Sequence, residues 1–248
     1  PQSDGKSRPI PNALTIAGVD PSGGAGILAD VKAMSALGAY GCAIIAALTA
    51  QNTQGVTGIS PVPPAFVGLQ IDTLFTDVRI DAVKIGMLGQ RPVIEVVAEK
   101  LAKWAPAHVV LDPVMVAKSG DLLLEKEAVG AMREAMLPQA TLLTPNLPEA
   151  GVLLEERPVE TVKEMRRVAE RLRNKLAHSG ERWVLVKGGH LPGNETIDLL
   201  HDGDRMIELP GHRIETVNTH GTGCTLSAAL AALLPQTGDV PELSLIHI

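Results

Sequence analysis

Short apolar segments rich in β-branched residues alternate along the chain with longer segments whose apolar residues recur every three or four positions. The first pattern is typical of buried strands and the second of helices packed on a sheet. Strands are predicted at Leu14 to Ala17, Cys42 to Leu48, Ala82 to Ile85, His108 to Leu111, Thr141 to Leu143, Trp183 to Val186, Glu195 to Asp202 and Arg205 to Ile214. Because strands and helices alternate, we expect an α/β fold with a mainly parallel central sheet covered on both faces.

Three of the intervening segments carry helix signals. Apolar residues at positions 27, 31, 34 and 37 fall on one helical face, as do those at 162, 165, 169, 172 and 176. Thr161 and Glu164 have the spacing of a capping box, which predicts where the second of these helices begins. An Ala-rich apolar segment from Leu226 to Leu234 predicts a third helix late in the chain.

Length and composition indicate the kind of core and the number of domains to expect. The chain has 248 residues, of which 45% are hydrophobic and only 2% aromatic, so its core must be built mainly from aliphatic side chains. This length can bury a large core and still form one domain. Since no linker divides the sequence, we expect a single domain over residues 13–248, preceded by a disordered or extended segment over residues 1–12.

Charge and cysteine content indicate which partners and which cellular location to expect for the protein. The net charge of -6 leaves no excess of Lys and Arg for a phosphate backbone, so nucleic acid is not an expected partner. The polar N-terminal residues lack the apolar core of a secretory signal, and no apolar stretch reaches about 18 residues, so no membrane association is predicted. Cys42 and Cys224 are too few for a disulfide framework, which is typical of the reducing cytoplasm.

The stretch before the third helix is a candidate anion site. Gly221, Thr222 and Gly223 would leave backbone N–H groups unpaired at a helix start, with the positive end of the helix dipole behind them. In a kinase that anion would be the transferring phosphoryl group. Cys224 follows at a position where the pKa of a thiol tends to fall, so it could accept a proton from an attacking hydroxyl. The alternatives are a glycine turn that only starts a helix, and an inert cysteine.

A second glycine-rich stretch, from Gly18 to Gly26, follows the first predicted strand. It loosely matches the dinucleotide fingerprint, but that motif needs an acidic residue about twenty positions later, and none occurs between Asp30 and Asp72. The G-x-x-x-x-G-K-[ST] phosphate loop is also absent from the sequence. We therefore expect these glycines to bring the backbone close to a small substrate.

Polar residues follow several of the predicted parallel strands. Asp112 ends one strand, Asn146 and Glu149 follow the next, and Lys187 ends a third. Ligands bind at the carboxyl ends of strands in open α/β sheets. Two carboxylates there could hold Mg²⁺ through waters while the metal contacts phosphates. The alternative is that Asp112 and Glu149 only cap helices and that Lys187 belongs to a turn.

Together these stretches resemble the ribokinase-like superfamily, in which a glycine pair after the first strand meets the substrate and a G-[TA]-G-[DC] turn starts a late helix. Within it, residues 17–26 (AGVDPSGGAG), residues 144–150 (TPNLPEA) and a cysteine at position 224 resemble the hydroxymethylpyrimidine/phosphomethylpyrimidine kinases of thiamine biosynthesis. The resemblance runs from about Ala13 to about Leu234. It implies a three-layer α/β/α sandwich.

The resemblance also implies an activity and its site. Such an enzyme uses ATP and Mg²⁺ to phosphorylate 4-amino-5-hydroxymethyl-2-methylpyrimidine, and then phosphorylates the monophosphate to the pyrophosphate. The implied pyrimidine-binding residues are Gln51, Gly18, Ala25, Asp30, Met87 and Val114. The implied nucleotide-binding residues are Asn146, Lys187, Gly189, Thr219 and Gly221, with Asp112 and Glu149 for the metal and with Cys224, Gly221, Thr222 and Gly223 catalytic.

Two alternatives remain at this point. A pyridoxal kinase of the same fold is the nearest, whereas sugar kinases usually have aspartate where Cys224 stands. A non-catalytic pyrimidine-binding remnant is the other, because the sequence after Leu234 does not resemble the last helices of the family. We therefore expect those helices to be missing and the adenine pocket to be incompletely walled. The resemblance suggests a homodimer.

Overall fold

The computed structural model describes residues 9–115, 123–125, 127–157, 159–191, 195–214 and 219–244. Within these ranges the backbone forms one nine-stranded sheet. From one edge to the other its strands are β3 (Val56–Pro61), β2 (Tyr40–Gln51), β1 (Asn12–Val19), β4 (Ala82–Ile85), β5 (His108–Leu111), β6 (Leu142–Leu143), β7 (Trp183–Val186), β8 (Glu195–His201) and β9 (Met206–His212). The pairs from β2 to β7 are parallel, whereas β3, β8 and β9 pair antiparallel.

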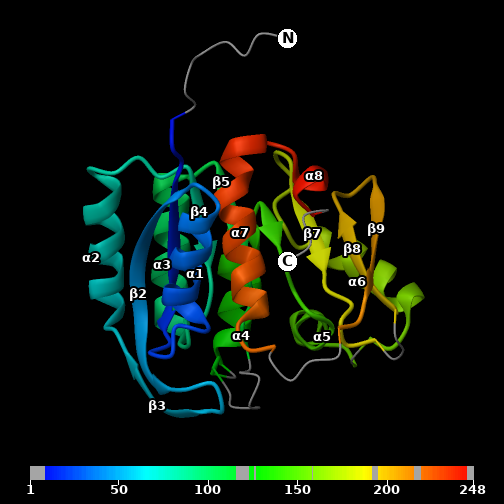
Figure 1. Cartoon of the computed structure of the whole chain (residues 1–248), viewed down its shortest axis with the longest axis horizontal. Coiled ribbons are helices and arrows are strands. Elements are labelled where there is room, and N and C mark those ends of the chain that lie inside the picture. The colour runs from blue at the N-terminus through cyan, green and yellow to red at the C-terminus, as the bar shows by residue number, and fades with distance from the viewer. Residues whose placement is uncertain are drawn as a thin grey trace.

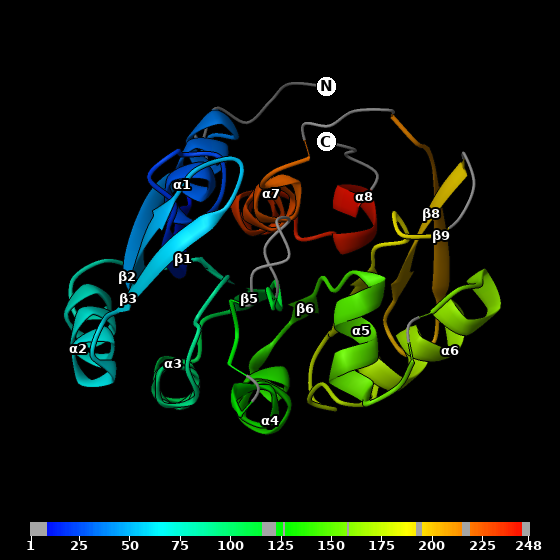
Figure 2. The same cartoon turned by 90° about the horizontal axis from the view of Figure 1, so that it is seen from below.

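Helices cover both faces of this sheet (Figures 1 and 2). On one face lie α2 (Pro64–Phe75), α3 (Arg91–Trp104), α4 (Ala128–Ala131), α5 (Leu147–Leu154) and α6 (Val162–Arg173), and α4 runs on through a π turn (Met132–Met136) and a 3₁₀ turn (Leu137–Gln139). On the other face lie α1 (Gly26–Ala36), α7 (Thr222–Thr237) and the short α8 (Val240–Ser244). The predicted three-layer α/β/α arrangement with a mainly parallel sheet is confirmed.

The core consists of two apolar layers, one on each side of the sheet. In β1, Leu14 and Ile16 belong to the layer under α2 to α6, whereas Ala13 belongs to the layer under α1 and α7. Because both faces of the central strands are buried, their sequences are continuously apolar rather than alternating. Thr15 is a buried polar exception, and its hydroxyl donates to Asp30 on α1 at 2.6 Å.

The predicted strands are all present, with shifts of a few residues at their ends. One strand escaped prediction: β3 pairs with the far end of the long β2, and five of its six residues are exposed. The capping box of α6 is confirmed, since Glu164 N–H donates to Thr161 Oγ1 at 3.2 Å and the Glu164 carboxylate accepts from Thr161 N–H. α7 begins at Thr222, four residues before the predicted Leu226, so Cys224 lies in its first turn.

The ends of the chain are described only in part. Residues 1–8 of the segment expected to be disordered or extended lie outside the described residues, and Asn12 already belongs to β1. After α7 the described chain contains α8, and residues 245–248 lie outside it. Among the described residues, no helix has the length and apolar character needed to cross a membrane.

Candidate active site

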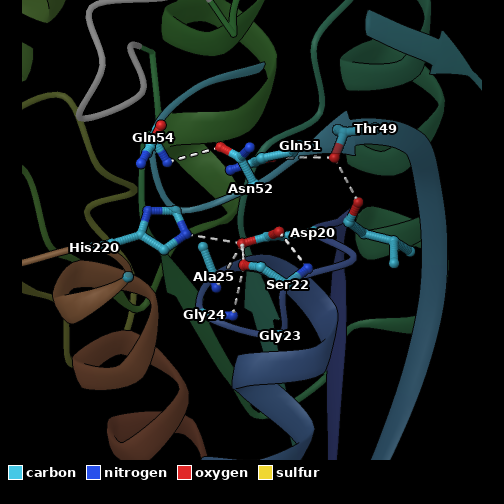
Figure 3. A network of polar contacts seen from close by, with 12 residues as sticks. Asp20, Ser22, Gly23, Gly24, Ala25, Thr49, Gln51, Asn52, Gln54 and His220 are labelled. Carbon is cyan, nitrogen blue, oxygen red and sulfur yellow. Dashed lines mark hydrogen bonds and ion pairs between the residues drawn. The ribbon is translucent and has the colours of Figure 1, made fainter. Parts of the chain in front are cut away.

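The two glycine-rich stretches meet at the carboxyl end of β1, although nearly the whole chain separates them (Figure 3). Gly221 is the N-cap of α7 and has a φ of 77°, in the left-handed region that favours glycine. A Cβ at Gly221 would lie 1.7 Å from the carbonyl oxygen of Gly24. A Cβ at Gly24 would lie 2.6 Å from Cδ2 of His220. Backbone therefore packs against backbone here, and neither position has room for a side chain.

The start of α7 presents its amides at the surface. Gly221, Gly223 and Cys224 are half-buried and Thr222 is exposed, so the turn is not covered by other side chains. The first N–H groups of a helix have no partner within it, and the helix dipole makes this end positive. Thr222 is held by bonds from its amide and hydroxyl to the carbonyl of Thr219, at 3.5 and 3.2 Å. The turn predicted to bind an anion therefore lies at the start of a helix and is partly open to solvent.

Asp20 organises the loop after β1. Its carboxylate accepts from the amide and the hydroxyl of Ser22, both at 2.8 Å, and from the amide of Ala25 at 3.1 Å. A further contact of 2.8 Å joins it to Nε2 of His220 (Figure 3). Burial alone would raise the pKa of Asp20, but the bonds from His220 and Ser22 outweigh burial and lower it. Sequence analysis did not select Asp20 or His220, because nothing in either stretch indicated that they would meet.

Cys224 differs from expectation in its ionisation. Its thiol keeps some contact with solvent, yet most of its surroundings are protein, and this burial raises the pKa of Cys224. The carboxylates of Asp112 and Asp30 act in the same direction, against Lys84 and the amide of Gly26, which lower the pKa. The expected fall in pKa is therefore not found. Burial therefore favours the neutral thiol of Cys224.

A buried ion pair lies under the site. Lys84 on β4 contacts Asp30 on α1 at 2.7 Å, and both side chains are fully buried. Burial alone would lower the pKa of Lys84, but the Cys224, Asp30 and Asp112 groups raise it. Oδ1 of Asp30 has no hydrogen-bond partner. Asp30, expected at the pyrimidine, binds Lys84 and Thr15 in this structure. Sequence analysis did not select Lys84, although a charge within an apolar strand was a signal for it.

A second charged group lies below the start of α7. Lys187 Nζ is 3.3 Å from Asp112 Oδ1, and Ser227 on α7 donates to Asp112 Oδ2 at 3.2 Å. A Cβ on Gly223 would lie 3.4 Å from Lys187 Nζ and 3.7 Å from Asp112 Oδ2. Burial alone would lower the pKa of Lys187, but Asp112 and Glu149 raise it. The predicted strand-end residues are thus brought together around the amide turn.

Asn146 and Glu149 form a capping box at the start of α5. Glu149 N–H donates to Asn146 Oδ1 at 2.9 Å, and Asn146 N–H donates to Glu149 Oε2 at 2.8 Å. Glu149 therefore caps α5, which leaves its predicted role at a metal untested, and Asn146 also lies beside Lys187 in an isolated β-bridge. Burial, together with the nearby charge of Asp112, raises the pKa of Glu149 to about 7, although Lys187 opposes this.

The residues expected around the pyrimidine lie on the other side of the turn. Gln51 accepts from the hydroxyl of Thr49 at 3.1 Å, and the same hydroxyl donates to the Val19 carbonyl at 2.8 Å (Figure 3). A Cβ on Gly18 would lie 2.3 Å from Cε of Met87, so the absence of a side chain there makes room for Met87. These residues therefore lie at the ends of β1 and β2 and in the loop after β4.

Three further predicted residues are placed more loosely. Val114 N–H donates to the carbonyl of Asp112 at 2.8 Å in the turn after β5. Gly189 is exposed beyond β7, and its carbonyl accepts from Arg213 at 3.0 Å. Thr219 is exposed before α7. These contacts of Val114 and Gly189 do not involve the amide turn, whereas the carbonyl of Thr219 accepts from Thr222 within it.

A divalent cation at this site would need phosphates and waters to complete its coordination. Among the described residues, no group of three or more His, Cys, Asp or Glu side chains is arranged to hold a metal. Asp112 and Glu149 influence each other as like charges, which is an environment that a cation relieves. Two carboxylates fit Mg²⁺ when phosphates and waters supply the remaining ligands.

The cavity found in the described part of the chain lies elsewhere. Its volume is about 250 Å³, and it is lined by residues at the amino ends of the strands, including His108, the first residue of β5, and Trp183, the first residue of β7. The glycine-rich stretches do not line it. This cavity and the candidate site therefore lie at opposite ends of the sheet.

Comparison with known proteins agrees with this architecture. The sheet and its helix layers have the ribokinase-like α/β fold of the small-molecule kinases whose solved structures are compared below. The family model for phosphomethylpyrimidine kinase matches residues 20–243. The chain belongs to the phosphomethylpyrimidine kinase family.

Individual relatives support the same assignment. A hydroxymethylpyrimidine/phosphomethylpyrimidine kinase of Escherichia coli is 55% identical over 227 residues, which are 91% of this chain and 83% of the relative. The crystal structure of phosphomethylpyrimidine kinase from Clostridium difficile 630 is 38% identical, with a TM-score of 0.82 over 94% of each chain. A Bacillus subtilis pyridoxal kinase, solved as an ADP complex, is 35% identical, with a TM-score of 0.85 over 94% of this chain and 87% of that one.

Proposed function

We propose that the protein transfers the γ-phosphoryl group of ATP to the hydroxymethyl group of 4-amino-5-hydroxymethyl-2-methylpyrimidine, and then to the phosphate of the resulting monophosphate. The observation that carries this proposal is the contact between Gly24 and Gly221, which places an acceptor loop directly beside an amide turn. The names of the family and of its relatives supply the substrate. The geometry supplies the reaction type, since a dense negative charge has an electropositive backbone to bind.

The donor side of the site is the group around α7. The amides of Gly221 to Gly223 would hold the transferring phosphoryl group, and Lys187 below them would offset its charge. Asn146 is placed beside Lys187, so both would face the nucleotide. We propose that Mg²⁺ arrives with the nucleotide and is held through water by Asp112 and Glu149, where it would neutralise phosphate charge. Thr219 and Gly189 would contact outer parts of the nucleotide.

The acceptor side is the end of β1 with its loop and the end of β2. The amide of Gln51 can donate to a ring nitrogen and accept from an exocyclic amine at once. Gly18, Ala25, Met87 and Val114 would surround the ring. Asp30 would act from below through Lys84, because its buried carboxylate is already bonded there.

Cys224 lies between the two sides. In this proposal the thiol of Cys224 first loses its own proton to solvent. The thiolate then receives the proton that the acceptor hydroxyl loses as the oxygen attacks phosphorus, and ADP leaves with the electrons of the broken P–O bond. The raised pKa of Cys224 makes the thiol a weak acid, so the corresponding thiolate would be a strong base once formed. The Lys84 cation under the site favours that thiolate.

A coupled ATPase assay with mass measurement of the product tests the function. The expected result with the hydroxymethyl pyrimidine is a product heavier by one phosphate, followed by a second one. A specific observation favours pyridoxal as a second candidate substrate, since the Bacillus subtilis structure superposes at a TM-score of 0.85. ATP consumption with pyridoxal alone would replace the first proposal by the second, and none with either alcohol would refute both.

We also propose that the protein is a homodimer. Apolar side chains are exposed on β2 and β3, at Leu48 and Ile59, and on α2, at Phe66 and Leu69. Exposed apolar groups of this kind favour an interface when they are contiguous. Light scattering at micromolar concentration measures the mass directly, and a monomer mass would refute the proposal.

A further inference from the structure

The contact between Asp20 and His220 joins two segments that are 200 residues apart. His220 immediately precedes Gly221, the N-cap of α7, and Asp20 opens the glycine loop after β1. His220 Nε2 lies 2.8 Å from Asp20 Oδ2, and the two side chains are only 17% and 2% exposed. The Asp20–His220 pair therefore ties the acceptor loop to the amide turn at the point where they meet (Figure 3).

The acidic end of this pair is rigid. Besides His220, the Asp20 carboxylate accepts from Ser22 N–H, Ser22 Oγ and Ala25 N–H. Three donors from its own loop fix the direction in which Asp20 points, so the imidazole binds to an anchor that does not rotate freely. The ring also lies directly over Gly24, where a Cβ would approach Cδ2 to 2.6 Å.

The packing of Gly221 on Gly24 cannot by itself hold the two loops at a fixed distance. A close contact between two backbones limits how near they approach, but it resists separation only weakly. A charge-assisted hydrogen bond acts in the other direction, because it holds its partners at one distance and one angle. The backbone contact thus limits how closely the two loops approach, and the Asp20–His220 hydrogen bond limits how far they separate.

We propose that the Asp20–His220 pair is a positioning device that sets the spacing between the acceptor loop and the phosphoryl-binding turn. The inference rests on the proposed function, since it concerns the geometry of that transfer. Neither side chain is assigned a contact with the reacting atoms. Transfer requires acceptor and donor at near-attack distance, and a displacement of about 1 Å can slow a reaction roughly 100-fold.

Two substitutions of His220 separate this role from others. The amide nitrogen of glutamine extends about as far as Nε2 of histidine, whereas that of asparagine extends only about as far as Nδ1. His220→Asn should therefore lose the bond to Asp20, and kcat should fall about 10- to 100-fold. His220→Gln should keep the bond and return kcat to within about threefold of the wild type. Equilibrium binding of the pyrimidine and of ATP should change little in either variant, because each half of the site stays intact.

A double-mutant cycle with Asp20→Asn tests the coupling. If the two side chains act through each other, adding Asp20→Asn to His220→Asn should slow kcat little further. Asp202→Asn is the matched control, because Asp202 also accepts from loop amides and pairs with a cation, Arg205, in the turn between β8 and β9. It should lower the melting temperature while leaving kcat unchanged.

The outcomes divide clearly. A His220→Gln enzyme as slow as His220→Asn, or losses that multiply in the double variant, would overturn the inference. Reduced melting temperatures with normal kcat would show a structural role alone and would also overturn it. If the wild-type protein phosphorylates neither alcohol, the proposed function fails first. The coupling of the two variants in thermal unfolding then still shows whether the pair tethers the loops, and additive effects there would reject it.

Discussion

The two ends of the parallel strands bury very different groups. At the carboxyl ends, Asp30, Lys84, Asp112 and Glu149 are buried ionisable side chains, and one carboxylate oxygen of Asp30 lacks a partner. Burying charge costs free energy unless each group is paired and hydrogen-bonded. An end of the sheet that keeps such charges is organised for a ligand that balances them.

A cavity of about 250 Å³ lies at the amino ends of the strands. Of the charged side chains that line it, Glu181 is exposed and Arg182 is half-buried, and each has a hydrogen-bond partner. Glu181 accepts from Trp183 Nε1 at 2.8 Å, and Arg182 donates to the Ala140 carbonyl at 3.3 Å. The comparison teaches that buried charge, rather than the volume of a hollow, marks the active end of this sheet.

Removing the sulfur at the carboxyl end should have the largest effect. Cys224→Ala should lower kcat about 100- to 10,000-fold, as expected for loss of a proton acceptor. Binding of the pyrimidine should change far less, because the proton moves only in the transition state. Steady-state kinetics with a separate titration of the pyrimidine measures both, and equal losses in the two would contradict the role. Cys42→Ala is the control. Cys42 is a buried core residue on β2, so its substitution should affect stability but not kcat.

Breaking the buried ion pair should come next. Lys84→Met keeps the length of the side chain but leaves Asp30 buried without its cation. The free energy of unfolding should fall by about 3 to 5 kcal/mol, measured by urea denaturation. Lys103→Met removes a half-exposed partner of Asp72 and should cost less than about 1 kcal/mol. Similar losses in the two variants would mean that the Lys84 pair is solvated.

A methyl group at the amide turn should slow the reaction without removing any charge. Gly221→Ala has no space for its Cβ beside Gly24, so the turn must move, and kcat should fall about 100- to 1,000-fold. Gly180→Ala is matched to it at the other end of the sheet, with a φ of 76° against 77° and no heavy atom within 4 Å of its Cβ. That control carries the same backbone strain, about 1 to 2 kcal/mol of stability, and should retain full activity.

Glu149 should make stability fall with rising pH. Its folded pKa of about 7 lies above the ordinary value of 4.5. Between these two values the unfolded chain has lost a proton that the folded chain retains, so stability drops across that window and stays low above it. At pH 8, Glu149→Gln should therefore be more stable than the wild type, by at most about 3 kcal/mol in the free energy of unfolding. Near pH 4 the two proteins should be equally stable.

The second capping box provides a control of opposite sign. Glu164 occupies the same position in α6, where bonds from the backbone at Glu160 lower its pKa against a small effect of burial. Its contribution is present above the ordinary pKa and is lost in acid, so Glu164→Gln should melt lower than the wild type at pH 8. Equal responses of the two variants to pH would refute the difference in burial on which this prediction depends.

The smallest effect should come from the amino end. Glu181→Gln retains an oxygen that can accept from Trp183, so stability should change by less than about 0.5 kcal/mol and kcat should not change. A kinetic defect there, measured in the same coupled assay, would break the contrast between the two ends of the sheet.

The fold was largely predictable because its strands are buried on both faces and so stand out as apolar runs. β3 was missed for the complementary reason, since it is mostly exposed and is held by pairing with β2 rather than by a pattern of its own. The amide turn was predictable from local chemistry, because a glycine pair before an apolar helix carries its own signal.

The remainder of the site depends on distant contacts. Nothing near Asp20 in the sequence indicates His220, and nothing near Asp30 indicates Lys84, because each pair forms only when β1, β4, α1 and α7 assemble. The direction of the Cys224 pKa was wrong for the same reason. The local rule sees a helix start, whereas burial and two distant carboxylates decide the result.

The joining of Asp20 to His220 also has a consequence for biosynthesis. A ribosome that adds roughly 5 to 20 residues per second needs about 10 to 40 seconds to pass from the first of these residues to the second. Throughout that interval the nascent polypeptide carries the loop with Asp20 but not yet His220 and the turn that starts α7. A nascent chain that ends before His220 therefore cannot form this contact.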